Sequence, residues 1–520
     1  MTGNEFDVIV IGAGHNGLVA ANYLAKAGKK VLVLERREMP GGQVVSETFG
    51  DGFTVDTLHA GGRLRPDIVA DLDLAKHGLR PDGEAKPVYL SLLPDGNRLH
   101  LVADASDAAT IASIREFSTS DAARWPEFVS FMNKAAAFLD AAYRTPMPRL
   151  PPTMSTGLPL AKLAWKLRRL GGKDMFKLIR AMSMSTLELT EEWFESEPLR
   201  AVIAAVGIHG STIGSMSAGG GYMLMHNWLN RGGLAHQPVS GGTGRITGAL
   251  VAALKANGGQ LRASAGVQKI MVDKQRVTGV RLDNGEEIST RNVFSAADPR
   301  HTFLDLVGAV ELPPEFVWHT QSIKMRGSVS KVHLHTDGSH GLPSGTLAIA
   351  PTLKYLERAF DAAKYGEISA EPYLEVTTRD VVVSIHFQFA PYKLRKSDWE
   401  TTSVPVGATP VAKGITARAQ VEQLAIETLA AHFPSLKASI KQVKSITPPD
   451  LEKTYGLTEG DLNHGQLILD QMFFMRPLPG WSNHRTPIDG LTLCGNGVHG
   501  GGGISGASGR NAARARLGES

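Results

Sequence analysis

The feature that most constrains this chain lies in its first 35 residues, where a short aliphatic run, a glycine-rich turn and a helical pattern follow one another. Val8 to Ile11 form a run of the kind found in buried parallel strands. The turn after it reads G-x-G-x-x-G, and apolar residues at helical spacing continue to Lys26. A second aliphatic run, Val31 to Leu34, ends at Glu35. This order predicts a βαβ unit within a parallel sheet.

The three glycines of the turn and the acid after the second strand predict dinucleotide binding. Gly12 permits the tight turn, Gly14 lets the backbone approach a pyrophosphate, and Gly17 lets the helix pack close to the sheet. The helix N-terminus offers free N–H groups to the phosphates. Glu35 lies about twenty residues further on, where an acid accepts hydrogen bonds from ribose hydroxyls. The predicted site also includes the neighbouring residues His15, Asn16 and Arg36.

A second glycine pair favours FAD over NAD. Gly41 and Gly42 follow soon after Glu35 and resemble the second glycine motif of flavoenzymes of the glutathione-reductase class. In that class the loop passes the ribityl and pyrophosphate region of FAD. The next residue, Gln43, stands where many desaturases and amine oxidases have arginine. Any role of that arginine therefore does not transfer to this chain.

The stretch from Pro238 to Pro299 predicts a second part of the same domain. Gly244 to Ala256 form an amphipathic helix, and a continuous strand is expected from Gln260 to Val272. Asn284–Gly285 signals a hairpin turn. In two-dinucleotide-type FAD domains the backbone at the position of Val267 meets the adenine edge. A simple α/β linker remains the alternative.

The chain resembles the carotenoid (phytoene) desaturase-like superfamily of FAD oxidoreductases. The resemblance rests on the N-terminal motif, the glycine pair, and three further stretches: "FTVD" at Phe53 to Asp56, "PVSGGTGRITGAL", and "GLTLCGNGVHGGGGISGASGRNAA". "LRPDIVADLDLAKHGL", Leu64 to Leu79, resembles the branch called pyridine nucleotide-disulphide oxidoreductase domain protein two. No redox dithiol marks that branch.

The resemblance implies an α/β fold with a Rossmann-like FAD-binding domain of the glutathione-reductase class. Residues 1–88, 238–299 and 481–520 would form this discontinuous domain. Residues 89–237 and 300–480 would form an inserted α+β substrate domain. Near the C-terminus, Gly495 and Asn496 would lie beside the pyrophosphate and ribityl chain. The run Gly500 to Gly503, and with it Gly502, Gly503 and Ile504, would pass against the isoalloxazine, with the last helix starting at about Ile504.

Composition narrows the remaining chemistry. A formal charge of +4 on 520 residues gives no strong positive potential that would attract nucleic acid. The single cysteine, Cys494, excludes an internal disulfide and a thiolate metal cage, and predicts a reducing compartment. No metal site is predicted, and FAD is expected to be non-covalent because Cys494 is not where some amine oxidases tether the flavin. The N-terminus lacks a signal-peptide pattern and no run approaches the ~20 apolar residues of a membrane span, so a cytoplasmic protein is expected.

Four residues are candidates for proton transfer near the flavin: His59, Arg63, His226 and His499. A histidine titrates near neutrality and can accept a proton when a C–H or N–H bond is oxidised. Each of the four can equally be a structural hydrogen-bonding residue.

A basic amphipathic stretch near residues 158–183 adds a surface feature. Seven cations accompany a single acid, Asp174, and apolar residues such as Trp165 alternate with them. Such a helix can lie on an anionic membrane and admit a lipophilic substrate. A solvated helix face and a contact in a homo-oligomer remain alternatives.

The predicted function is that of an FAD-dependent oxidoreductase, a dehydrogenase, desaturase or oxidase, that removes hydride from an apolar or amphipathic small molecule. Only one G-x-G-x-x-G unit with a ribose acid is present, so electrons would pass to oxygen, a quinone or another diffusible acceptor. Three alternatives stay open: a flavin amine oxidase, a flavin-dependent isomerase or saturase, and an FAD-binding regulatory or partner protein with little turnover.

Overall fold

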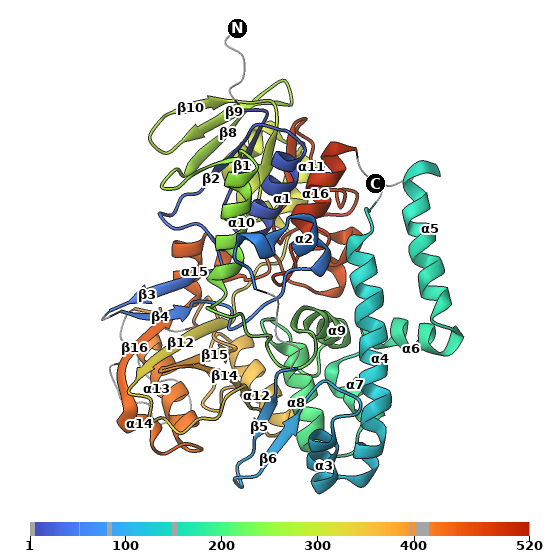
Figure 1. Ribbon diagram of the computed structural model, residues 1–520, viewed down its shortest axis with the longest axis vertical. Coiled ribbons are helices and arrows are strands. Elements are labelled where there is room, and N and C mark those ends of the chain that lie inside the picture. The colour runs from blue at the N-terminus through green and yellow to red at the C-terminus, as the bar shows by residue number, and fades with distance from the viewer. Residues whose placement is uncertain are drawn as a thin grey trace.

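A five-stranded parallel sheet forms the upper part of the molecule (Figure 1). The computed structural model describes residues 6–50, 52–80, 86–147, 154–395, 398–400 and 415–518. Every neighbouring pair in this sheet is parallel. In spatial order the strands are β17 (Leu491–Leu493), β11 (Val293–Ser295), β1 (Val8–Ile11), β2 (Val31–Leu34) and β7 (Gln260–Arg262).

Alternation along these aliphatic strands produces two cores, because successive side chains of a strand point to opposite faces. Val8 and Val10 pack into the core formed with α1 (His15–Lys26), α10 (Gly244–Ala256) and α16 (Ala507–Leu517). Ile9 and Ile11 pack into the core on the other face. Both faces are therefore covered, as the unbroken aliphatic runs predict. The short helices α2 (Pro66–Asp71) and Leu74–His77 close the edge of the first core.

The other face of the parallel sheet is covered by a three-stranded antiparallel sheet. The single strand predicted from Gln260 to Val272 is wrong, because this stretch contributes to both sheets. The chain leaves the parallel sheet after β7 and re-enters regular structure as β8 (Val267–Asp273). Ser264 has a positive φ of 51°, and a Cβ on Gly266 would stand 2.1 Å from Asp283 Oδ2, so the chain bends sharply between the strands. The remaining elements of this face are β9 (Arg276–Leu282), β10 (Glu287–Ser289), a π-helical turn (His301–Gly308) and α11 (Pro314–Gln321).

A larger, mainly antiparallel sheet lies in the lower part of Figure 1. Only β13 and β5 pair in parallel within it. Its strands, in spatial order, are β16 (Ile440–Ile446), β12 (Val329–Thr336), β15 (Val382–Gln388), β14 (Leu374–Arg379), β13 (Thr346–Ile349), β5 (Tyr89–Leu92) and β6 (Arg98–Leu101). Around it lie α12 (Leu353–Lys364), α13 (Ala417–Ala430), α14 (Leu436–Ser439) and α15 (Pro448–Tyr455). The hairpin β3 (Ser46–Phe49) and β4 (Phe53–Asp56) lies between the two sheets.

A helical layer packs against β5, β6 and α12 and completes the described fold. It contains α3 (Ala108–Phe117), α4 (Thr119–Arg144), α7 (Thr186–Trp193), α8 (Glu197–Ile208) and α9 (Gly220–Arg231). The basic stretch forms two helices, α5 (Met154–Arg169) and α6 (Gly172–Ser183), with Gly171 at φ +88° between them. The fold is thus mixed α/β, with a parallel sheet and an antiparallel sheet. The residue at which each domain begins and ends stays a prediction.

Candidate cofactor and substrate site

A cleft opens at the carboxyl ends of β1 and β2, the place where parallel α/β sheets bind ligands. Most of the predicted cofactor residues line it. The predicted residues on its wall are Gly12, Gly14, His15, Asn16, Gly17, Glu35, Arg36, Gly42, Gln43, Val267, Gly495 and Asn496. Gly41 lies behind this wall, where its N–H donates to the Ala13 carbonyl at 3.0 Å. We call this site the nucleotide cleft.

The glycines of the nucleotide cleft are required by close approaches of backbone. A Cβ on Gly17 would stand 2.2 Å from the carbonyl oxygen of Gly12, so a side chain there would push α1 off the turn. Gly42 has φ +57°, and its Cβ would lie 3.0 Å from the Cα of Gly14. The two glycine motifs therefore touch and form one narrow cradle.

Glu35 is held in place by two backbone N–H groups. Its Oε2 accepts from the Ala13 N–H at 2.8 Å and its Oε1 from the Arg37 N–H at 3.0 Å. Each carboxylate oxygen keeps acceptor capacity for a hydroxyl group. Arg36, which lines the cleft, donates from Nη2 to the carbonyls of Lys453 and Thr454 at 3.1 and 2.8 Å, and these bonds hold its guanidinium against α15.

Buried polar atoms of the nucleotide cleft fit a polar cofactor. Within the described residues, His15 Nε2, Asn16 Oδ1 and His464 Nδ1 are buried without a hydrogen-bond partner, although their residues line the cleft. Buried polar groups are normally satisfied, so such a cluster indicates a missing polar ligand. Burial, with a smaller contribution from His464, lowers the pKa of His15 to about 4, so its imidazole is neutral. No side chain caps α1, whose first N–H groups face the cleft. These residues fit a dinucleotide.

A second pocket adjoins the first, and five imidazoles line it. Asn496 belongs to both pockets, and His59 Nε2 lies 3.3 Å from Oε1 of Gln43, a residue of the nucleotide cleft. We call it the imidazole pocket. Its polar lining comprises His59, His209, His226, Asn227, Asn230, Arg231, His236, Gln237, Lys331, His386, Asn463 and Asn496, and its apolar lining includes Leu58, Met223, Leu462 and Ile504.

Two of the four proton-transfer candidates reach the imidazole pocket. His226 is buried, with Tyr143 OH 2.7 Å from Nδ1 and Asn230 Nδ2 3.0 Å from Nε2. Burial, and secondly Arg476, lowers the pKa of His226 to about 3. Burial, and secondly Lys331, also lowers the pKa of His59 to about 3. Both imidazoles are therefore neutral near pH 7 and are weak bases.

The other two candidates lie elsewhere. Arg63 is exposed and lines neither pocket. His499 Nε2 lies 3.2 and 3.1 Å from the carbonyl oxygens of Ala142 and Thr145, so the ring anchors the end of α4. The sequence placed both residues near the flavin because they adjoin recognised motifs, but adjacency along the chain does not bring them into the pockets.

The C-terminal glycine run, predicted to pass against the isoalloxazine, packs against α9 on one side. A Cβ on Gly502 would lie 2.7 Å from His226 Cε1, and one on Gly503 would lie 2.7 Å from Asn230 Cγ. The run therefore packs tightly against α9 of the protein itself. Gly503 and Ile504 line the imidazole pocket, Gly502 lines neither pocket, and α16 begins at Ala507 rather than near Ile504.

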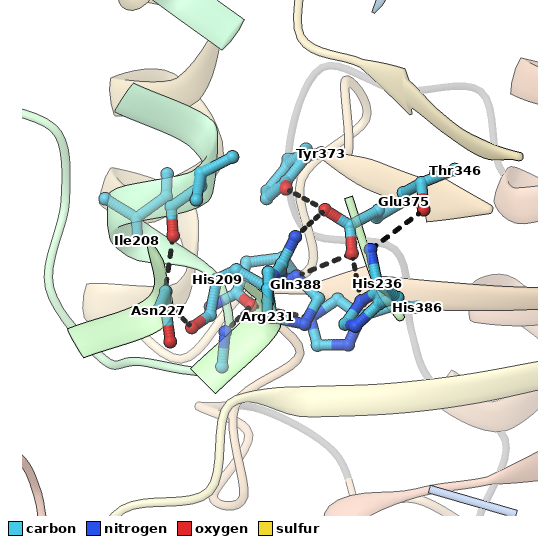
Figure 2. A network of polar contacts seen from close by, with 12 residues as sticks. Ile208, His209, Asn227, Arg231, His236, Thr346, Tyr373, Glu375, His386 and Gln388 are labelled. Atoms are coloured by element: carbon cyan, nitrogen blue, oxygen red, sulfur yellow. Dashed lines mark hydrogen bonds and ion pairs between the residues drawn. The ribbon is translucent and has the colours of Figure 1, made fainter. Parts of the chain in front are cut away.

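A buried carboxylate that no sequence pattern indicated lies beside the imidazole pocket. Glu375 on β14 accepts from Arg231 Nη1 at 3.0 Å and has His236 Nε2 2.6 Å from its Oε1 (Figure 2). The hydroxyls of Tyr89 and Tyr373 each donate to it at 3.2 Å. Arg231 and the two nearby imidazoles hold the pKa of Glu375 well below its usual range despite burial.

Lys331 on β12 was also missed. Its ammonium lies 3.1 Å from His386 Nδ1, and the His386 ring stacks on that of His209 with centroids 3.8 Å apart. Burial lowers the pKa of Lys331 to about 8. The sequence signal for Lys331 and His386 was the alternation of polar with apolar residues in "SKVHLH" and "SIHFQF", the strands that carry them. This alternation does not say which strands are neighbours.

The two helices α5 and α6 present aromatic and cationic side chains to the outside. α5 lies at the right of Figure 1, with α4 between it and the rest of the molecule, whereas α6 packs against α9 through Leu178 and Ala181. Leu158 and Trp165, seven residues apart, are 56% and 60% exposed, and Phe176 and Ile179 are 69% and 50% exposed. Within the described residues no acidic partner contacts Lys162, Lys166, Arg168 or Lys173. Among those same described parts of the chain, no helix is long and apolar enough to cross a membrane.

Comparisons with known proteins agree with this geometry. The sequence model of the family described as flavin containing amine oxidoreductase matches residues 17–387. Pyridine nucleotide-disulfide oxidoreductase domain-containing protein 2 of Rattus norvegicus is 32% identical over 560 residues, covering 98% of this chain and 93% of that protein. Phytoene desaturase (lycopene-forming) of Paracoccus sp. is 25% identical over 534 residues, covering 98% and 96%.

A solved structure shares the fold. Wild-type putrescine oxidase bound to putrescine superimposes with a TM-score of 0.58 at 17% identity, covering 99% of each chain. At this identity the likeness concerns the arrangement of sheets and helices, and it says nothing of the substrate.

Proposed function

Because the chain belongs to the flavin-containing amine oxidoreductase family, we propose that it binds FAD without a covalent link and oxidises an amphipathic organic substrate in the imidazole pocket. The observation that carries the proposal is the junction of the two pockets at Asn496. A dinucleotide held along the glycine cradle would extend across this residue into the imidazole pocket. Cys494, the single cysteine, is buried and lines neither pocket, which supports non-covalent binding.

Bound FAD supplies the two-electron acceptor that no side chain offers. The chain's own residues would bind and orient the substrate and exclude water. Leu58, Met223 and Leu462 contribute apolar surface to the pocket, and most of its other lining residues are polar. A molecule with one apolar and one polar part satisfies both.

The charged residues of the imidazole pocket favour a substrate other than an amine. Arg231 and Lys331 line the pocket, and no Asp or Glu stands among the described residues of its lining. An ammonium group would enter a buried site whose two cations already outnumber the one carboxylate beside them, Glu375, which is electrostatically unfavourable. This lining favours a substrate without positive charge.

Anaerobic reduction of the bound flavin tests the proposal. We expect the flavin absorbance band to bleach in the absence of oxygen with an amphipathic alcohol, alkene or acid from a graded panel, and to remain with alkylamines of the same length. Readmission of oxygen, or addition of a quinone, should restore the band. The proposed function would be rejected if only amines bleached the flavin. It would also be rejected if FAD were bound and no compound of the panel bleached it.

We further propose that α5 and α6 bind the surface of an anionic membrane, where a lipophilic substrate would be found. The aromatic and cationic groups on this helical pair are the two components that bind interfacial helices to acidic lipids. Sedimentation with vesicles containing phosphatidylserine should recover the protein, and neutral phosphatidylcholine vesicles should recover far less.

The double substitution Trp165→Ser and Phe176→Ser should lower vesicle binding by about tenfold, since each removes an exposed aromatic side chain from the contact. Trp318→Ser is the matched control, because Trp318 is 63% exposed on α11, outside α5 and α6. Equal recovery with both vesicle types, or an equal effect of the control, contradicts the membrane proposal.

A further inference from the structure

The buried charges around the imidazole pocket do not balance. Arg231, Lys331 and Glu375 have 6%, 8% and 2% of their surface exposed. The surrounding imidazoles, His59, His209, His226, His236 and His386, all have lowered pKa values because burial disfavours their charged forms. Among these residues two cations face one carboxylate, and a single positive charge remains uncompensated in a buried site. The further buried cation beside His226, Arg476, has the buried carboxyl group of Asp461 near it. An uncompensated buried charge is costly unless a partner arrives.

The donors of the two cations are also incompletely used. Within the described residues, Arg231 Nη2 is buried and has no hydrogen-bond partner, while its Nη1 is occupied by Glu375 and the Leu234 carbonyl. In the same described part of the chain, the only hydrogen-bond partner of the Lys331 ammonium is His386 Nδ1, although an ammonium carries three donors. Both residues line the pocket. Unused N–H donors and an uncompensated positive charge thus occur together in the polar lining, or polar wall, of the imidazole pocket.

We propose that this wall binds the carboxylate of an organic acid, with Lys331 and Arg231 as the donors, so that the substrate is an amphipathic acid. The inference rests on the proposed function and names the polar part of its substrate. One negative charge balances the site, whereas a phosphate dianion would leave a buried negative charge. The apolar surface of Leu58, Met223 and Leu462 would receive the rest of the molecule.

A metal ion is a poorer occupant of the same region. His209, His236 and Glu375 offer three ligand atoms within 4.8 Å of one another. Glu375 is however already engaged by Arg231 and two tyrosine hydroxyls. A divalent cation would raise the buried positive charge from one to three, so the charge balance points to an anion.

Ligand titration of the FAD-loaded protein, without turnover, tests the inference. Benzoate, its neutral isostere benzamide and the dianion phenyl phosphate are titrated separately by calorimetry, while the flavin difference spectrum is recorded. We expect benzoate to bind and perturb the spectrum, and the other two compounds to bind at least about tenfold more weakly. Three results with the parent protein would each overturn the inference. Benzamide could bind as tightly as benzoate, phenyl phosphate could bind more tightly than benzoate, or benzoate could fail to bind.

Substitutions then locate the site. Lys331→Gln should weaken benzoate binding at least about tenfold, and Lys331→Arg should retain most of it. Lys441→Gln, which removes an exposed lysine from the edge strand β16 of the same sheet, should have no effect. Unchanged benzoate affinity in Lys331→Gln contradicts the assignment. If a neutral alcohol bleaches the flavin while benzoate does not bind, the proposed function stands and the acid-binding inference alone falls.

Discussion

Replacing Gly14 with valine is expected to abolish FAD retention while leaving the FAD-free protein folded. Gly14 has φ −68° as the residue before α1, a conformation open to any amino acid, and the nearest protein atom to its Cβ would be Gly42 Cα at 4.0 Å. The protein itself therefore leaves room for a Cβ here. The valine would instead fill the cradle between the two glycine motifs, where a pyrophosphate must approach the backbone.

The measurement is FAD affinity by equilibrium dialysis, with the melting temperature of the FAD-free protein as a check on folding. We expect a loss of at least about 100-fold in affinity, which is about 2.7 kcal/mol, and a melting temperature close to that of the parent. Gly248→Ala, inside α10 with no atom within 4 Å of the added Cβ, is the matched control and should bind FAD normally. Undiminished FAD binding by Gly14→Val would remove the cofactor from the nucleotide cleft.

Acidification is expected to unfold the protein between about pH 6 and 4, at a higher pH than carboxylate titration alone would require. Burial, as the largest cause in each case, lowers the pKa of seven histidines to between about 3 and about 4. They are His15, His59, His226, His333, His464, His484 and His499.

The lowered histidine pKa values determine whether the free energy of unfolding rises or falls as the pH falls. In the unfolded chain a histidine takes up a proton below its ordinary pKa of 6.5, while the buried imidazole stays neutral until about pH 4. Below pH 6.5 the unfolded state therefore binds more protons, and stability falls as the pH falls. Each histidine contributes up to about 1.4 kcal/mol per pH unit in this window. Seven together exceed the 5–15 kcal/mol stability of a typical domain within about two pH units.

Denaturant unfolding at several pH values measures how steeply the free energy of unfolding changes with pH. His484→Asn should reduce the number of protons taken up on unfolding by about one, because an asparagine amide can replace the ring N–H near the Leu493 carbonyl without titrating. His319→Asn is the control: this histidine of α11 is only partly buried, with 44% of its side chain exposed, and its loss should change the proton uptake much less. A free energy of unfolding that is constant from pH 7 to 4.5 would show that these histidines are not buried neutral.

Local patterns predicted the elements that bind the nucleotide. β1 and β2 begin and end at the residues expected, and so does α10. These segments are short, their apolar periodicity is regular, and glycines with positive φ end or join them, so each is determined within about twenty residues. Two element bounds were wrong. The strand divided at Ser264 was predicted as one because two apolar runs were joined although the chain bends between two sheets, and the last helix begins at Ala507 rather than near Ile504.

The imidazole pocket could not be predicted in the same way. Glu375, Lys331 and His386 lie on three strands of one sheet, and Arg231 comes from a helix of another layer. His226 was named from its sequence, but its partner Tyr143 lies 83 residues away. The alternation of a strand shows which residues share its face, yet it does not reveal the strand that pairs with it.

The amino-acid sequence by itself therefore determined a flavin-type nucleotide fold, because glycine conformation, strand burial and helix dipole are properties of contiguous residues. The tertiary structure alone decided what stands in the second pocket. Five histidines, an arginine and a lysine come together there from distant segments, and beside them lies a single carboxylate. Charge balance depends on distance through space, and in this chain that distance is set by the pairing of strands and the packing of α9 beneath them.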